Sequence, residues 1–370
     1  MLKPTLHASE ILSNKTSRLG GLICLVILIL TLSGCASPAS CAPNCSGANL
    51  SGKNLQGVDF QGVILSQANL SRANLEGANL RGADLKGANL QDAMLNYADL
   101  TNATLVGANL TKAQLSGATL DSVDLSAADL TSAVLTRVSL SNVKLVGTIF
   151  KNTRLIGVNL DGADLSGINM QGANLTGASL AGVSMAGSKL DSAIIRGVDF
   201  SGSALEGSYM ANADLRGSNL IQASLSGADL SHARLSGVDL TLSELIGANL
   251  FQADLSGANL ISANLKAADL QAAWLNGAIL VGANLQDAVL AGVESAPASG
   301  SEQPATYFSA MTTGVDLRQA NLKNTYLAGV TLSGCNLAET NIQDAILTAT
   351  VGINGTPQTK KALFLGSPLP

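Results

Sequence analysis

Ala78-Asn79-Leu80-Arg81-Gly82 and Ala83-Asp84-Leu85-Lys86-Gly87 are two successive units of the five-residue pattern that decides the fold of this chain. The pattern runs from Leu50 to Leu290, where each of the 49 residues at intervals of five is Leu, Phe, Met or Ile. A small or short residue, most often Ala, precedes nearly all of these large residues by two positions, with Lys53 as a charged exception, and Gly is frequent two positions after the large residue. Most of the chain is therefore one short repeat.

A period of five fits neither regular secondary structure. Residues five apart on an α-helix differ by about 140°, and on a straight strand they point to opposite faces. The large residues share one side only if the chain bends once in every repeat. The small and the large residue then lie on the inner face of a short extended segment, and Gly favours the bend. We therefore expect a solenoid whose coils pair through their backbones at about 4.8 Å.

The same units resemble the A(D/N)LXX signature of the pentapeptide-repeat family. The resemblance implies an all-β fold, a right-handed four-sided (quadrilateral) β-helix with four repeats in each coil. On that geometry the repeats from Leu50 to Leu290 make about 12 coils and a rod roughly 60 Å long. Some members of this family resemble duplex DNA in shape and negative charge and occupy type II topoisomerases.

Residues 1–34 are predicted to be a lipoprotein signal peptide. Basic residues are followed by the apolar run Leu22–Leu30 and then by Leu32-Ser33-Gly34-Cys35. This last segment resembles a bacterial lipobox, which implies that Cys35 is lipidated and becomes the new N-terminus. The alternative is an uncleaved membrane anchor over Leu19–Ala36. We expect an extracytoplasmic, membrane-anchored lipoprotein of the periplasm or cell envelope, and Ala36 favours the outer membrane by analogy with Gram-negative lipoproteins.

Residues 35–46 are expected to form a tether. Cys41 and Cys45 are close enough in sequence to form a small disulfide loop in an oxidising compartment, and the alternatives are a redox pair or a metal-binding pair. Cys335 falls on a small-residue core position, where a cysteine acts as an apolar filler.

The repeats occupy residues 47–291 and are interrupted by a Pro- and Ser-rich segment, predicted to be a loop insertion at 292–314. They resume two residues out of phase at 315–347. The segment 348–370 has no such rhythm and is interpreted as a C-terminal tail or cap for the open end of the solenoid.

Two groups of outward residues are candidate binding surfaces. Residues 20 apart would stack on a four-sided helix, which places Ile221, Thr241, Ile261 and Val281 in one apolar column. The apolar residues of this column reflect either the ordinary β-propensity of stacked strands or a docking surface. Such a surface would bind a partner or the insertion, through Tyr307, Phe308 and Met311. A second column contains Met94, Val134, Ile194 and Trp274, interrupted by Arg154 and Arg234. Trp274 and Phe251 are interpreted as exposed partner contacts.

Charge and composition argue against several classes of function. Without residues 1–34 the chain carries 18 basic and 25 acidic side chains, so it lacks the excess of positive charge typical of nucleic-acid binders. The two histidines, His7 and His232, belong to no catalytic triad or zinc-ligand pattern, and the Asp and Asn residues lack the spacing of a calcium loop. We predict no catalytic residue, no metal and no cofactor.

The sequence therefore predicts a non-enzymatic, lipid-anchored extracytoplasmic rod that acts as a scaffold or protein-binding surface. Its expected partners are the membrane, through the lipidated N-terminus, and an unidentified protein. A homodimer through the end of the solenoid is a further expectation. The alternative is a DNA-mimicking binder of a type II topoisomerase in the cytoplasm.

Overall fold

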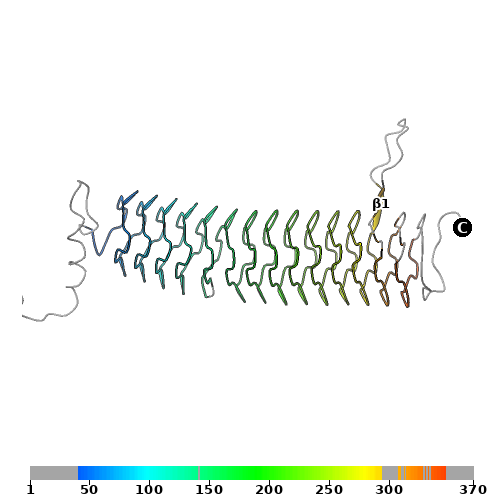
Figure 1. Cartoon of the computed structure of the whole chain (residues 1–370). Coiled ribbons are helices and arrows are strands. Elements are labelled where there is room, and N and C mark those ends of the chain that lie inside the picture. The colour runs from blue at the N-terminus through cyan, green and yellow to red at the C-terminus, as the bar shows by residue number, and fades with distance from the viewer. Residues whose placement is uncertain are drawn as a thin grey trace, which may run out of the picture.

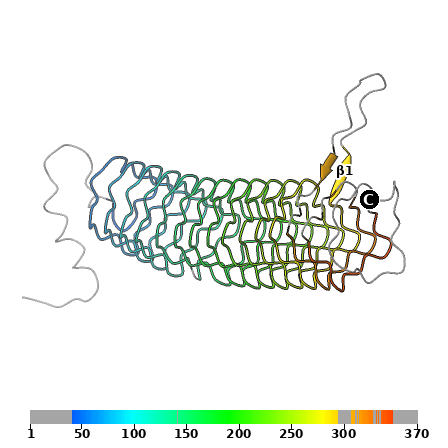
Figure 2. The same ribbon diagram turned by 45° about the vertical axis from the view of Figure 1, so that its right-hand side comes forward.

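The computed structural model describes residues 41–140, 142–293, 307–309, 312, 314–327, 330, 332 and 335–346. These residues form a single stack of coils, with the N-terminal coils at the blue end and the C-terminal coils at the orange end (Figures 1 and 2). The predicted signal peptide, its Cys35 and the tail at 348–370 lie outside the described residues.

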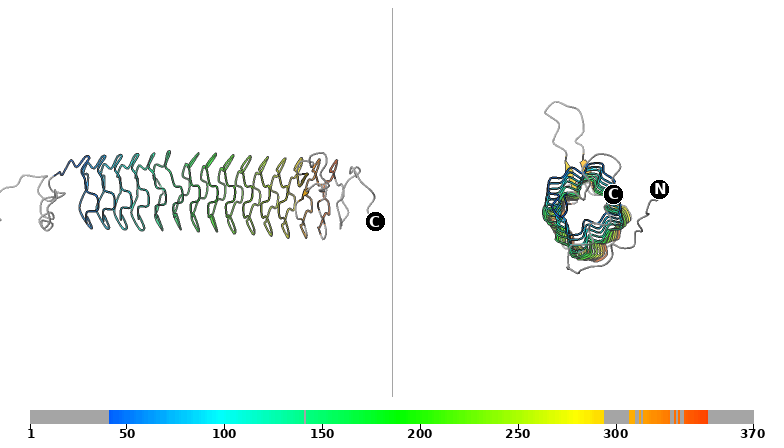
Figure 3. Two further views of the ribbon diagram at one scale, coloured as in Figure 1. Left: turned by 90° about the horizontal axis from the view of Figure 1, so that it is seen from above. Right: turned by 90° about the vertical axis from the view of Figure 1, so that its left-hand side faces the viewer.

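Each coil contains 20 residues, because parallel bridges join residues 20 apart, such as Asn69 with Asn89 and Asn89 with Asn109. A bridge recurs at every fifth residue, so a coil has four sides separated by four corners. Seen end on, the coils superpose as a closed ring (Figure 3). The pairing consists of single-residue bridges rather than continuous strands, since each side is interrupted by a corner after a few residues.

Leu80–Ala83 shows how one corner is built. The Ala83 amide donates to the Leu80 carbonyl at 3.0 Å, which closes a four-residue turn. Gly82, the third residue of the turn, has a φ of 62°, as in a type II turn, and this conformation explains why Gly recurs at that position. The Asn79 side chain supports the same corner, since its Oδ1 accepts from the Arg81 amide at 3.2 Å. The Asn or Asp before each large apolar residue is therefore a turn residue.

Hydrogen bonds along the rod axis join each coil to the next. The Leu80 amide donates to the Asp99 carbonyl at 2.7 Å, and the Asp99 amide donates to the Ala78 carbonyl at 3.0 Å. The Gly82 amide at the corner donates to the Thr101 carbonyl at 2.9 Å. Because sides and corners both take part, the coils hold one another in a fixed register.

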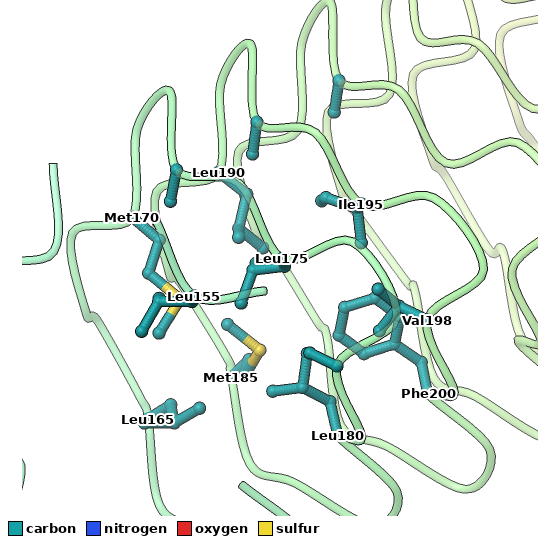
Figure 4. Close-up of a cluster of buried hydrophobic side chains, with 14 of the residues drawn as sticks. Leu155, Leu165, Met170, Leu175, Leu180, Met185, Leu190, Ile195, Val198 and Phe200 are labelled. Carbon is teal, nitrogen blue, oxygen red and sulfur yellow. The ribbon is translucent and has the colours of Figure 1, made fainter. Parts of the chain in front are cut away.

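The interior of the rod is filled by the large residue and the small residue of each repeat, which confirms the prediction from the period of five. Leu180, Phe150 and Phe200 are fully buried, and alanines such as Ala173 lie beside them. Figure 4 shows a group of these side chains, among them Leu155, Leu180 and Phe200, pointing into the space enclosed by the coils. The core is one continuous column over the described length of the rod.

The structure describes two short strands at the insertion, one near each of its ends. Strand β1 (Ala291–Val293) pairs antiparallel with β2 (Tyr307–Ser309), with Gly292 opposite Phe308. Stacking then resumes across the insertion, since Ile279 pairs with Asp316, and it returns to the 20-residue interval where Asp316 pairs with Asn336.

The position of β1 shows where the insertion leaves the rod. Leu290 is followed directly by β1, so the insertion leaves the rod at the corner that carries Phe251 in the coils below. The column of Ile221, Thr241, Ile261 and Val281 occupies the diagonally opposite corner, two sides away. The base of the insertion is therefore not next to the apolar column that we expected it to cover. The side chains of Tyr307 and Phe308, and all of Met311, lie outside the described residues.

Among the described residues, no helix combines the length and the apolar character needed to cross a bilayer.

Candidate interaction surfaces

The apolar column at one corner of the rod consists of Ile221, Thr241, Ile261 and Val281, which stack in consecutive coils. The Leu242 amide donates to the Ile261 carbonyl and the Ser262 amide donates to the Val281 carbonyl, each at 2.9 Å. The four side chains are half-buried. The column ends at Arg318, where a shallow hollow is lined by Val281, Arg318, Gln319, Ala338 and Glu339.

A second surface contains most of the rod's arginines. Parallel bridges join every member of one outward ladder, which consists of Asn54, Asn74, Met94, Gln114, Val134, Arg154, Asn174, Ile194, Asp214, Arg234, Asp254 and Trp274. The corner after this ladder carries Arg137, Arg196 and Arg216, and the corner before it carries Lys151 and Phe251. We call this ladder, with its two flanking corners, the arginine face.

Asp214 organises the centre of the arginine face. Its carboxylate accepts two bonds from Arg216, from Nε and Nη2, each at 2.8 Å. It also accepts from Arg196 Nε at 2.7 Å, and the Arg196 Nη2 atom lies 2.6 Å from Oδ2. The Asp214 side chain is only 9% exposed, whereas the two guanidinium groups reach solvent. One carboxylate thus holds two arginines in place and leaves a net positive charge at the surface.

The pKa of the Asp214 carboxyl lies far below its ordinary value, chiefly because of the hydrogen bonds from Arg216 and then from Arg196, which outweigh the effect of burial. A carboxyl whose pKa is lowered by folding stabilises the folded state above its unfolded pKa and loses that contribution as the pH falls.

We therefore expect Asp214→Asn to lower the thermal midpoint by a constant amount between about pH 5 and pH 8. The difference from wild type should shrink below about pH 4, as the unfolded-state carboxyl becomes protonated. Thermal melts followed by circular dichroism across this range measure the effect. A difference that persists undiminished to about pH 2 contradicts this account of Asp214.

Both predicted aromatic contacts lie on the arginine face, Trp274 in the ladder and Phe251 on the corner before it. Trp274 ends the described ladder and is 50% exposed. Phe251 is half-buried on the preceding corner, where the His232 ring meets it edge to face at 5.6 Å. His232 also has a positive φ, which places it at the corner position usually taken by Gly.

The remaining predicted site residues lie apart from these surfaces. Cys41 and Cys45 form a disulfide at the start of the first coil. Cys335 is a buried thiol that donates to the Thr312 carbonyl, and burial raises its pKa. No group of three or more His, Cys, Asp or Glu side chains among the described residues is arranged to hold a metal ion.

Sequence reasoning identified Arg154 and Arg234 only as interruptions of an apolar column. It missed that Arg137, Arg196 and Arg216 lie beside that column, because they occur at other positions of the repeat. The signal was present in the sequence: stacking the corner positions at intervals of 20, together with the ladder positions, brings all five arginines to one side.

The comparison with known proteins agrees with the repeat architecture. The model of the family described as pentapeptide repeats matches eight segments, which are 44–77, 68–105, 98–137, 133–172, 168–207, 208–243, 243–282 and 313–350. No curated protein matches the chain.

Several solved structures are similar to this chain. HetL, a pentapeptide repeat protein involved in heterocyst differentiation regulation in Nostoc sp. strain PCC 7120, is 32% identical over 64% of this chain and 90% of its own, with a TM-score of 0.32. A pentapeptide repeat protein from Cyanothece 51142 is 36% identical over 30% of this chain and 90% of its own, with a TM-score of 0.29. QnrB1, a plasmid-mediated fluoroquinolone resistance protein, is 18% identical over 58% of this chain and 88% of its own, with a TM-score of 0.25.

The matched segments cover well over half of the sequence, on both sides of the insertion. They include the coils that carry both candidate surfaces. The chain therefore belongs to the pentapeptide-repeat family.

Proposed function

We propose that this protein is a non-enzymatic rod, anchored outside the cytoplasm by a lipid on Cys35, that acts as a scaffold or protein-binding surface. Family membership supports a structural or binding role and implies that the coils form a right-handed four-sided β-helix. The observation that carries the proposal is the continuous apolar core, which leaves the outer faces of the described coils as the places for recognition.

The core also supports the mechanical part of this role. A side chain such as Leu180 is fully buried between neighbouring coils, and burying a leucine contributes about 1.5–3 kcal/mol. Because a large apolar residue is buried on every side of every coil, each coil packs against its neighbours along the whole described rod, which supports a rigid scaffold.

The lipid anchor is proposed from Leu32-Ser33-Gly34-Cys35 and is tested by Cys35→Ser. After the membranes are washed at about 0.5 M salt, which screens charge-dependent binding, we expect wild-type protein in the membrane fraction and the variant in the soluble extracytoplasmic fraction, because the lipid chains on Cys35 would supply the remaining membrane affinity. Cys335→Ser is the matched control and should not change the distribution. Wild-type protein in the cytoplasm would contradict the anchor and favour the topoisomerase-binding alternative, which supercoiling assays would then test.

Protein partners are proposed to dock on the outer faces, and two copies to associate through the end of the solenoid. Light scattering of the soluble Cys35→Ser protein tests whether two copies associate. A monomer at all concentrations would contradict this association.

A further inference from the structure

The charges of this rod are sorted by face. The arginine face carries eight basic side chains against five acidic ones. The basic ones are Arg72, Lys112, Arg137, Lys151, Arg154, Arg196, Arg216 and Arg234, and the acidic ones are Glu76, Asp92, Asp191, Asp214 and Asp254. The remaining described surface carries eight basic side chains against 18 acidic ones. An acidic protein thus has one long side with a net positive charge.

The arginines on this face are available for a ligand. Arg154 and Arg234 are exposed members of the ladder, and neither forms an ion pair with any of the described residues. The Asp214 carboxylate is shared by Arg196 and Arg216, so that cluster also remains positive.

Exposed aromatic and apolar side chains lie on the same face. Trp274 is the single tryptophan of the chain, and Tyr97, on the corner after the ladder, is 70% exposed. Met94 and Ile194 in the ladder are also exposed. Tryptophan and tyrosine favour the boundary between lipid headgroups and hydrocarbon, and arginine pairs with headgroup phosphates.

We propose that the arginine face binds the surface of a bilayer containing anionic phospholipids, so that the rod lies lengthwise on the membrane. Met94 and Trp274 are nine coils apart on an unbroken ladder, which corresponds to a face about 43 Å long. The parallel bridges continue along the whole ladder, so its side chains form one continuous row. The insertion leaves the rod just beyond the Trp274 coil, at the corner that carries Phe251, so the proposed contact with the bilayer covers the coils before it. This inference deepens the proposed function, since a lipid on Cys35 would hold the rod at the same membrane.

The experiment uses residues 36–370, which lack the lipidation site and include the complete described core and hydrogen-bond network. Vesicles of phosphatidylcholine alone are compared with an equimolar mixture of phosphatidylcholine and phosphatidylglycerol. We expect sedimentation with the anionic vesicles only, release at about 0.5 M salt, and a blue shift of the Trp274 fluorescence on binding.

Arg154→Ala combined with Arg234→Ala tests the face directly. Each basic residue near an anionic surface raises binding about fivefold, so the double variant should bind about 25-fold more weakly. The matched control is Lys189→Ala with Lys266→Ala, which removes the same charge from exposed positions on other sides of the rod and should bind nearly like wild type. Thermal melts check that all variants fold.

Three results would overturn the proposal: no binding to anionic vesicles, equal binding to neutral vesicles, or an equal loss in the lysine control. Binding of a protein that requires Arg154 and Arg234, with no binding to vesicles, would assign the face to that partner instead. These outcomes are separate from the anchor. Failure of the anchor appears in fractionation of the Cys35→Ser variant after the salt wash, which removes binding through the face, whereas failure of the face appears in this vesicle experiment.

Discussion

Leu180→Asp is expected to unfold the coils around position 180 and to expose the middle of the rod. Leu180 is fully buried, and its amide donates to the Asp199 carbonyl of the next coil at 2.9 Å. The substitution removes about 1.5–3 kcal/mol of apolar burial and places a carboxylate, without a partner, where the effective cost is several kcal/mol more. The sum is comparable to the whole stability of a typical domain, about 5–15 kcal/mol.

The loss of folded structure should extend to the adjacent coils, because each coil is buried only by the coils above and below it. Hydrogen exchange followed by mass spectrometry should show lost protection over residues 155–205, with protection kept near both ends. Gln171→Asp adds the same charge at an exposed corner in the same part of the rod and should leave exchange unchanged. Unchanged protection in Leu180→Asp would show that this position tolerates a charge and that the axis is not a continuous dry core.

Deleting 20 residues from the middle of the rod is expected to preserve both the fold and the arginine face. Deleting ten residues is expected to preserve the fold but to divide the arginine face between two opposite sides of the rod. Both deletions remove whole repeats, so the buried residues keep their spacing and every new coil can still pair at the 20-residue interval. Removal of 166–185 takes out one complete coil, whereas removal of 171–180 takes out half a coil. Neither segment contains a charged residue, so the net charge stays the same.

The half-coil deletion turns everything after it to the opposite side of the rod. Arg196, Arg216, Arg234 and Trp274 then lie opposite Arg137, Lys151 and Arg154. We expect both variants to melt cooperatively, with binding to anionic vesicles near wild type after deletion of 166–185 and reduced by about 25-fold or more after deletion of 171–180. Equal binding by the two folded variants would show that the basic residues do not act as one face.

The local features of the fold could be predicted because burial and turn geometry depend on residues within a single repeat. Leu80 and Ala83 are buried and Gly82 has positive φ, as the positions in the repeat require. The role of Asn79 as a turn residue follows from the same short-range geometry, since its side chain reaches an amide only two residues away.

The surfaces were harder to predict. Asp214 and Arg196 are 18 residues apart and meet only because one coil stacks on the next. Where the insertion leaves the rod relative to the apolar column also depends on stacking: β1 starts ten residues after Val281, which is half a coil and therefore the opposite corner. A contact of this kind depends on the number of sides in a coil.

The five-residue period by itself determined that this chain buries a leucine axis and turns at regular intervals, because turn geometry and burial of alternate residues act within a single repeat. Only the stacked structure decided which outward side chains become neighbours, since the same repeat can face any of four directions and its face depends on where it falls in the 20-residue coil. The core is therefore a local property of the sequence, and the arginine face is a property of the assembled rod.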